Sequence, residues 1–126
     1  MHILRIKKLT FEAAHYLPTS KRERKLHGHS FTLENITVCC SKHVDPRKIK
    51  SVVKSLDHKI LIPREDEDYW KKFWHPHFEA DYIVIDNVPT VENIAEYLEE
   101  QLRSIDGVEY VTFVLYECPN QGVAQC

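Results

Sequence analysis

The chain has 126 residues, of which 43% are apolar and 29% are charged, and this length and composition fit one folded domain. Its formal net charge of -2 excludes the strongly basic surface that is typical of nucleic-acid-binding proteins. No apolar run is long enough to span a membrane, and the spacing of the four cysteines does not suggest a disulfide framework. We therefore expect a single cytoplasmic domain over residues 1–126, with neither nucleic acid nor membrane as a partner.

The first half of the chain predicts two strands and a helix. Loosely alternating apolar residues indicate a strand over 3–14, and a second strand follows over 29–41 after a charged connection at 17–26. Asp45 and Pro46 are typical of the N-cap and the first residue of a helix. Apolar residues at spacings of three and four then continue this helix to about residue 56.

The second half predicts a helix and two strands after an irregular segment. Residues 63–79 are expected to form an inserted loop or a short helix, and 82–85 a short strand. Thr90 is the expected N-cap of a strongly amphipathic helix that ends before Gly107, and strands are expected over 109–117 and 122–125.

This order of elements indicates an α+β fold, in which two helices cover one face of an antiparallel sheet. The strand at 109–117 is apolar on both of its faces. We therefore expect subunit association to bury the face that the helices leave open.

Three histidines form the most informative group of residues. His27 and His29 are two positions apart, so in a strand their imidazoles point the same way. His15 ends the preceding strand, and antiparallel pairing around the 16–26 connection would bring it beside them. Three imidazoles with an open fourth position is an arrangement known for catalytic Zn²⁺. The alternative is a solvated strand face that happens to carry histidines, as we expect for His2, His43, His75 and His77.

Two further features carry ionisable side chains in suggestive places. Asp57 precedes His58 directly after the first helix, where it could orient the imidazole for acid–base chemistry, or where His58 could simply complement the end of the helix dipole. Glu117 ends an apolar strand, so its side chain either faces inward toward a partner with paired N–H donors or lies on the surface.

Five short motifs in register give the chain a recognisable pattern. They are Phe11-Glu12-Ala13-Ala14-His15, Leu26-His27-Gly28-His29-Ser30-Phe31, Leu56-Asp57-His58, Pro89-Thr90-Val91-Glu92-Asn93 and Tyr116-Glu117. Together they resemble the 6-pyruvoyltetrahydropterin synthase / 6-carboxytetrahydropterin synthase family, over nearly the whole chain.

The resemblance implies a specific fold and activity. The fold is the T-fold (ββααββ), a four-stranded antiparallel sheet with two helices on one face, which oligomerises into a barrel as a homohexamer of two trimers. The implied substrate is 7,8-dihydroneopterin triphosphate, the implied cofactor is Zn²⁺, and the implied metal ligands are His15, His27 and His29. Glu117 would anchor the pterin ring with Thr90 nearby, and Asp57 and His58 would join a proton relay at a site between subunits.

The chain departs from the family pattern in the loop before His27. Most members carry a cysteine there as base, but no cysteine occurs between residues 1 and 38. Glu23 stands four residues before His27, and a branch of the family uses glutamate and releases 6-hydroxymethyl-7,8-dihydropterin. Glu23 is therefore a candidate base, or else a solvated residue that balances the charge of Lys21, Arg22, Arg24 and Lys25, which could themselves meet the triphosphate.

The chain departs from the family pattern in two other segments. The connection from strand to helix at 40–48 is short, and the segment at about 63–86 is longer than is typical, which indicates an insertion. The product could be 6-hydroxymethyl-7,8-dihydropterin of folate synthesis, or a 6-carboxy- or 6-pyruvoyl-tetrahydropterin of queuosine- or archaeosine-type pathways. The alternative is a catalytically silent protein that binds a pterin or a purine.

Overall fold

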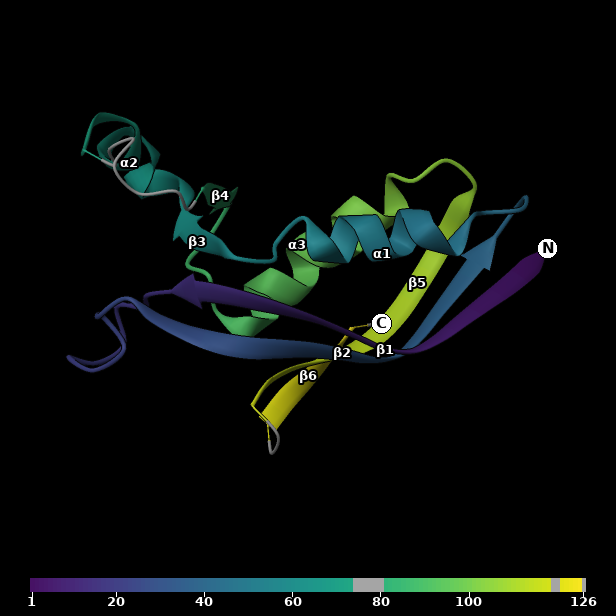
Figure 1. Ribbon diagram of the computed structural model, residues 1–126, viewed down its shortest axis with the longest axis horizontal. Coiled ribbons are helices and arrows are strands. Elements are labelled where there is room, and N and C mark those ends of the chain that lie inside the picture. Colours follow the sequence, from purple (N-terminus) through teal and green to yellow (C-terminus); the bar gives the residue numbers. More distant parts are fainter. Residues whose placement is uncertain (74–80, 119–120, 126) are drawn as a thin grey trace.

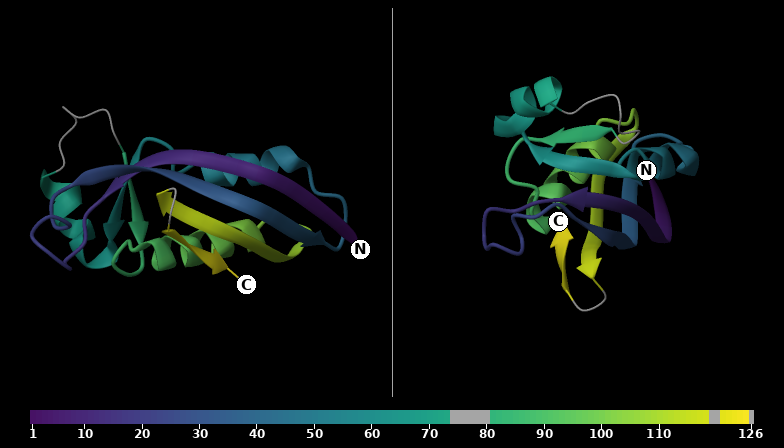
Figure 2. Two further views of the ribbon diagram at one scale, coloured as in Figure 1. Left: turned by 90° about the horizontal axis from the view of Figure 1, so that it is seen from below. Right: turned by 60° about the vertical axis from the view of Figure 1, so that its left-hand side comes forward.

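A long antiparallel hairpin organises the molecule. In the computed structural model, β1 (His2–His15) and β2 (His27–Cys40) pair along their whole length, from His2 opposite Cys40 to His15 opposite His27. The hairpin runs the length of the molecule, with the N-terminus at one end and the 16–26 connection at the other (Figures 1 and 2). Both predicted strands are confirmed. β1 begins one residue earlier than predicted, and β2 begins two residues earlier.

The sheet is larger than predicted. It has six strands in the order β4-β3-β1-β2-β5-β6, which include β5 (Val108–Cys118) and β6 (Gln121–Gln125) on one side of the hairpin. On the other side, β3 (Lys59–Pro63) runs parallel to the end of β1, and β4 (Tyr82–Ile85) runs parallel to β3. The prediction of a four-stranded, purely antiparallel sheet is therefore wrong, although the fold is α+β as expected.

The missed strand β3 shows why the sheet was underestimated. Its sequence Lys-Ile-Leu-Ile-Pro is a short apolar run without alternation, because four of its five residues are buried. Parallel strands that are covered on both faces have such continuous apolar sequences, and periodicity does not separate them from a buried turn of helix.

Two helices cover the sheet over its main core. The helix α1 (Pro46–Lys54) begins with Asp45 as N-cap, whose side chain accepts a hydrogen bond from the Arg47 N–H, and it ends two residues earlier than predicted. The helix α3 (Val91–Arg103) begins after Thr90, as predicted. Both lie on the same side of the β1, β2 and β5 strands (Figure 1). The core between these helices and the sheet includes Phe11, Phe31, Leu33, Ile49, Val53, Ile94, Leu98 and Leu102.

The predicted insertion is ordered in its described part and adds a second, smaller core. A 3-10 turn (Arg64–Asp66) leads into α2 (Glu67–Phe73), so a short helix forms rather than a loop, and the helices number three instead of two among the described residues. Trp70 of α2 packs with Ile60 and Ile62 of β3 and with the partly buried Tyr16 and Tyr82. This cluster ties α2, β3 and β4 to the end of the hairpin.

The structure describes residues 1–73, 81–118 and 121–125. His75 and His77, which we expect to be solvated or packed, lie outside the described residues. Within these ranges, every helix is too short or too polar to cross a lipid bilayer.

Candidate metal centre

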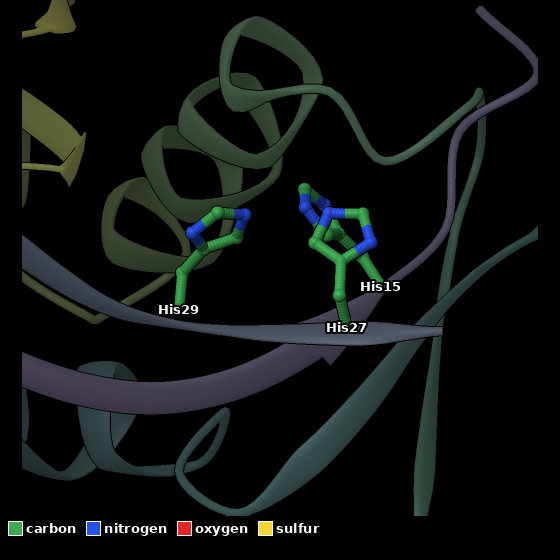
Figure 3. Close-up of side chains that lie close together, drawn as sticks. All are labelled: His15, His27 and His29. Carbon is green, nitrogen blue, oxygen red and sulfur yellow. The ribbon is translucent and has the colours of Figure 1, made fainter. Parts of the chain in front are cut away.

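The hairpin register brings three imidazoles together at one end of the sheet. His15 lies directly opposite His27, and His29 lies opposite Ala13, two residues further along the same face. The three side chains therefore rise from adjacent strands on the side that faces α3 (Figure 3). The predicted antiparallel pairing of the end of β1 with the start of β2 brings the three imidazoles together.

The rings converge through one nitrogen each. Their centroids are 4.7 Å apart for His15 and His27 and 5.0 Å apart for both pairs with His29. The candidate ligand atoms all lie within 4.8 Å of one another. The three Nε2 atoms are buried, and no group in the described part of the chain forms a hydrogen bond with any of them. Buried polar atoms are rarely left unsatisfied, so this trio fits a metal ion held by three imidazoles.

Backbone carbonyls orient two of the rings. The Nδ1 of His15 lies 2.7 Å from the carbonyl oxygen of Pro89, and the Nδ1 of His27 lies 2.7 Å from that of Lys25. A carbonyl only accepts, so both Nδ1 atoms carry the proton and each Nε2 keeps a free lone pair. This is the tautomer and the outer contact that metal-binding histidines usually have.

His15 is the most enclosed member of the trio. Its side chain is fully buried, and burial lowers the pKa of its imidazole below the ordinary value of 6.5, against the opposing effect of the Pro89 carbonyl. The ring is therefore neutral at pH 7. A neutral imidazole is the form that binds a metal ion.

Two carboxylates flank the histidines. Oε2 of Glu23 lies 3.3 Å from Nε2 of His27, and Oε1 of Glu117 lies 3.4 Å from Nε2 of His29. Neither contact has hydrogen-bond geometry, so the imidazole lone pairs stay directed into the centre. Both residues that the sequence singled out are thus beside the trio, at opposite ends of the His27–His29 segment.

A pocket opens next to Glu117. It has a volume of about 480 Å³ and is lined by Val91, Glu92, Glu117, Gln121, Gly122 and Val123. Thr90 caps α3 at this point, because its hydroxyl accepts a hydrogen bond of 3.2 Å from the Asn93 N–H. The first turn of α3, the Glu117 carboxylate and the imidazoles therefore share one region of the molecule.

The Asp57–His58 pair lies elsewhere. Asp57 accepts a hydrogen bond of 2.7 Å from the Glu12 N–H, and its other oxygen lies 3.0 Å from Nδ1 of His58. His58 lines a pocket of about 560 Å³ with Glu12 and Ser30. Glu12 and Ser30 alternate with Ala13 and His29, so they point to the opposite face of the sheet. Within one chain, the structure does not bring the His58 imidazole to the metal centre.

The backbone around His58 is held in an uncommon conformation. His58 has a φ of 59°, in the left-handed region, and its N–H donates a hydrogen bond of 2.6 Å to the Glu12 carbonyl. The Asp57 pKa lies below its ordinary value of 3.8, first because of the bond from the Glu12 N–H and also because of His58. The His58 backbone is thus held by Glu12, and its imidazole, which is 81% exposed, is held by the Asp57 carboxylate.

Sequence patterns did not identify the groups that orient the site. The carbonyls of Pro89 and Lys25 are backbone atoms, which no residue type marks. The contact between Glu12 and Ser30, by contrast, could have been predicted from the sequence. In this contact the Ser30 hydroxyl donates to both carboxylate oxygens of Glu12, at 2.9 and 2.7 Å. The register that pairs His15 with His27 also pairs Glu12 with Ser30.

Comparisons with known proteins identify the family. The family model described as 6-pyruvoyl tetrahydropterin synthase matches residues 5–125. No significant match was found among curated proteins. Among solved structures, a catalytic-residue mutant of Plasmodium vivax 6-pyruvoyltetrahydropterin synthase has 20% identity and a TM-score of 0.66, with 99% of this chain and 98% of that chain covered.

Two further structures are similar to this chain. The Plasmodium falciparum 6-pyruvoyl tetrahydropterin synthase has 16% identity and a TM-score of 0.61, over 98% of this chain and 96% of that one. An uncharacterized protein from Wolinella succinogenes has 20% identity and a TM-score of 0.68, over 99% and 98%. At these identities the likeness shows a shared fold. Because the family model covers nearly the whole chain, the protein belongs to the 6-pyruvoyl tetrahydropterin synthase family.

Proposed function

We propose that the chain is a Zn²⁺-dependent pterin synthase or lyase that acts on 7,8-dihydroneopterin triphosphate. One observation carries this proposal: three buried imidazole nitrogens, which have no hydrogen-bond partner among the described residues, converge between two carboxylates in a chain of this family. His15, His27 and His29 would hold the ion. A bound zinc ion would polarise the hydroxyls of the substrate side chain and lower their pKa.

Glu117 is the proposed anchor for the pterin ring. The 2-amino-4-oxo-pyrimidine edge offers two N–H donors, and a carboxylate accepts such a pair in a bidentate manner. The pocket beside Glu117 has a volume of about 480 Å³, which suits a bicyclic ring, and its wall includes the first turn of α3 after Thr90. A ring fixed there would extend its side chain toward the imidazoles.

Glu23 is the proposed base. Its carboxylate is 36% exposed and adjoins His27, so it can take a proton from a substrate hydroxyl that lies at the centre. In the Plasmodium vivax 6-pyruvoyltetrahydropterin synthase mutant, the catalytic residue that is replaced is a glutamate. This supports a glutamate in place of the cysteine that this chain lacks, and with it the release of 6-hydroxymethyl-7,8-dihydropterin by retro-aldol cleavage.

Asp57 and His58 are proposed to act on the site of a neighbouring subunit. The His58 ring is exposed and fixed by Asp57, on the face opposite to its own chain's imidazoles. A proton relay through His58 therefore needs a second copy, which agrees with a homohexamer of two trimers. In such an assembly each active site combines two chains.

The test is metal content together with turnover of 7,8-dihydroneopterin triphosphate by the purified protein. We expect about one zinc per chain, and 6-hydroxymethyl-7,8-dihydropterin as the product. Acetaldehyde with carboxytetrahydropterin would instead assign the 6-carboxytetrahydropterin activity. Zinc-loaded protein that binds a pterin without turning the triphosphate over would contradict an enzymatic role and leave the silent pterin- or purine-binding alternative.

A further inference from the structure

Tyr16, which follows the candidate metal ligand His15, is held by the inserted segment. Its hydroxyl donates a hydrogen bond of 2.6 Å to Oδ2 of Asp66 and accepts one of 3.0 Å from Nε1 of Trp70. The Tyr16 and Trp70 rings also stack, with centroids 6.2 Å apart and an interplanar angle of 18°. Both residues lie in the inserted segment, Asp66 on the 3-10 turn and Trp70 on α2.

This contact is a strong one by its chemistry. The Tyr16 hydroxyl donates to a carboxylate oxygen at 2.6 Å and accepts from the Trp70 indole N–H at 3.0 Å, so two groups of the inserted segment hold the same oxygen. Hydrogen bonds to an ionised carboxylate are stronger than those between neutral groups. The ring itself belongs to the small core formed around Trp70, Ile60 and Ile62.

The residue after Tyr16 holds the loop that carries Glu23. The Leu17 N–H donates a hydrogen bond of 2.7 Å to the Glu23 carbonyl, and the Leu17 side chain is 9% exposed. Within the loop, the Ser20 hydroxyl accepts a bond of 3.2 Å from the Glu23 N–H. The backbone on both sides of the Glu23 Cα is thus tied to the start of the loop, immediately after Tyr16.

The other end of the loop is tied to the metal centre. The Lys25 carbonyl contacts Nδ1 of His27, and the Glu23 carboxylate lies against Nε2 of the same ring. The Glu23 side chain therefore has its place set by two supports, one at Lys25 and one at Leu17. The second support, at Leu17, directly follows Tyr16, whose hydroxyl contacts the inserted segment.

We propose that Tyr16 is a positioning residue through which the insertion, by way of Asp66 and Trp70, fixes the Leu17–Glu23 contact and so holds the Glu23 carboxylate at the metal centre. This inference rests on the proposed role of Glu23 as base. Tyr16 does not act on substrate, because both hydrogen bonds of its hydroxyl are used within the protein and its ring packs in the small core. The insertion thereby serves the active-site loop as well as the sheet.

Two variants test this proposal by changing the hydrogen bonds of the Tyr16 hydroxyl while keeping the Tyr16 ring. Tyr16→Phe deletes both hydrogen bonds, and Asp66→Asn keeps an acceptor in the same place. Tyr110→Phe is the matched control, since Tyr110 lies on β5 with 49% of its surface exposed. The primary readout is amide hydrogen exchange at Leu17, measured by NMR on the full chain, with Leu33 in the central strand β2 reporting global opening.

We expect Tyr16→Phe to speed exchange at Leu17 by about tenfold or more, Asp66→Asn to speed it less, and Tyr110→Phe to leave it unchanged. Zinc affinity should stay within about threefold in all three variants, while turnover falls in kcat rather than KM for Tyr16→Phe alone. Unchanged exchange at Leu17, or an acceleration no greater than at Leu33, would overturn the proposal. If Glu23→Gln leaves turnover intact, the role of Glu23 is wrong, and the exchange data still decide whether Tyr16 holds the loop.

Discussion

The two faces of the sheet at the end of the β1–β2 hairpin carry different groups of ionisable side chains. One face holds three buried imidazoles, with Glu23 and Glu117 beside them. The opposite face holds His58, an exposed imidazole fixed by Asp57. Under the proposed function, these two groups act in one active site only when it is formed by two chains. We therefore expect substitutions on the first face to change metal binding or turnover at the chain's own site, and substitutions at His58 to change turnover at a neighbour's site.

The largest expected effect separates the two faces by metal affinity. His29→Ala removes one of three ligands, so we expect the zinc affinity to fall by more than about 100-fold, since loss of an outer contact alone costs about 10- to 100-fold. His58→Ala is the matched control and should keep the affinity within about twofold. Titration with a zinc chelator measures both. Equal losses for the two variants would contradict the assignment of the ligands.

Glu23→Gln should abolish most of the turnover while the metal stays bound. A general base contributes about 10²- to 10⁴-fold to a rate, and the amide cannot accept the proton. Zinc content should be unchanged, because among the described residues the cluster of candidate ligand atoms consists of the three imidazoles. Glu109→Gln, an exposed position on β5, serves as the control. Retention of turnover by Glu23→Gln would assign the proton transfer to another group.

Mixing two inactive variants tests whether the faces come from different chains. His29→Ala lacks the metal on one face, and His58→Ala lacks the relay on the other. If each site draws one face from each of two subunits, random co-assembly at equal amounts restores about a quarter of the sites. Turnover should therefore reappear after the two variants are unfolded together and refolded. Failure to recover activity, with wild-type protein recovering under the same conditions, would place both faces in one chain.

Thr90→Ala should weaken the start of α3. The hydroxyl accepts a hydrogen bond from the Asn93 N–H, and loss of such a cap costs about 1 kcal/mol of unfolding free energy. Thr90→Ser keeps the oxygen and should recover most of the loss. Urea denaturation measures both variants. A loss of equal size in Thr90→Ser would show that the methyl group, rather than the cap, supplies the stability.

Sequence patterns predicted those parts of the fold that short-range rules determine. The caps at Asp45 and Thr90 and the meeting of His15 with His27 follow from residue type, periodicity and antiparallel register. The strand β3 did not follow, because a short apolar run at 59–63 fits several structures equally well. The mixed segment after it left a loop and a short helix open, and the structure has the short helix α2 there.

The orientation of His58 was also beyond reach of the sequence. Its place depends on a left-handed backbone conformation at a non-glycine residue and on a bond from the Glu12 N–H to Asp57. Both features depend on the parallel pairing of β3 with the end of β1, directly after the turn that contains His58. This pairing joins residues that lie far apart in the sequence. Glu23 lies beside His27, four residues away in the same loop, and its role as the base stays a prediction.

The smallest expected effect is that of Asp57→Asn, which should change how the stability of the protein depends on pH. The pKa of Asp57 is lowered in the folded state, so the carboxylate adds stability above its ordinary pKa of 3.8, and this contribution is lost as the pH falls through the lower folded value. Asp57→Asn should therefore lower Tm at pH 7, and the difference from wild type should shrink below pH 3.8. Melting curves across this range measure the difference. A difference that stays constant with pH would mean that the Glu12 N–H and His58 do not favour the charged form, and that another group holds the His58 ring in place.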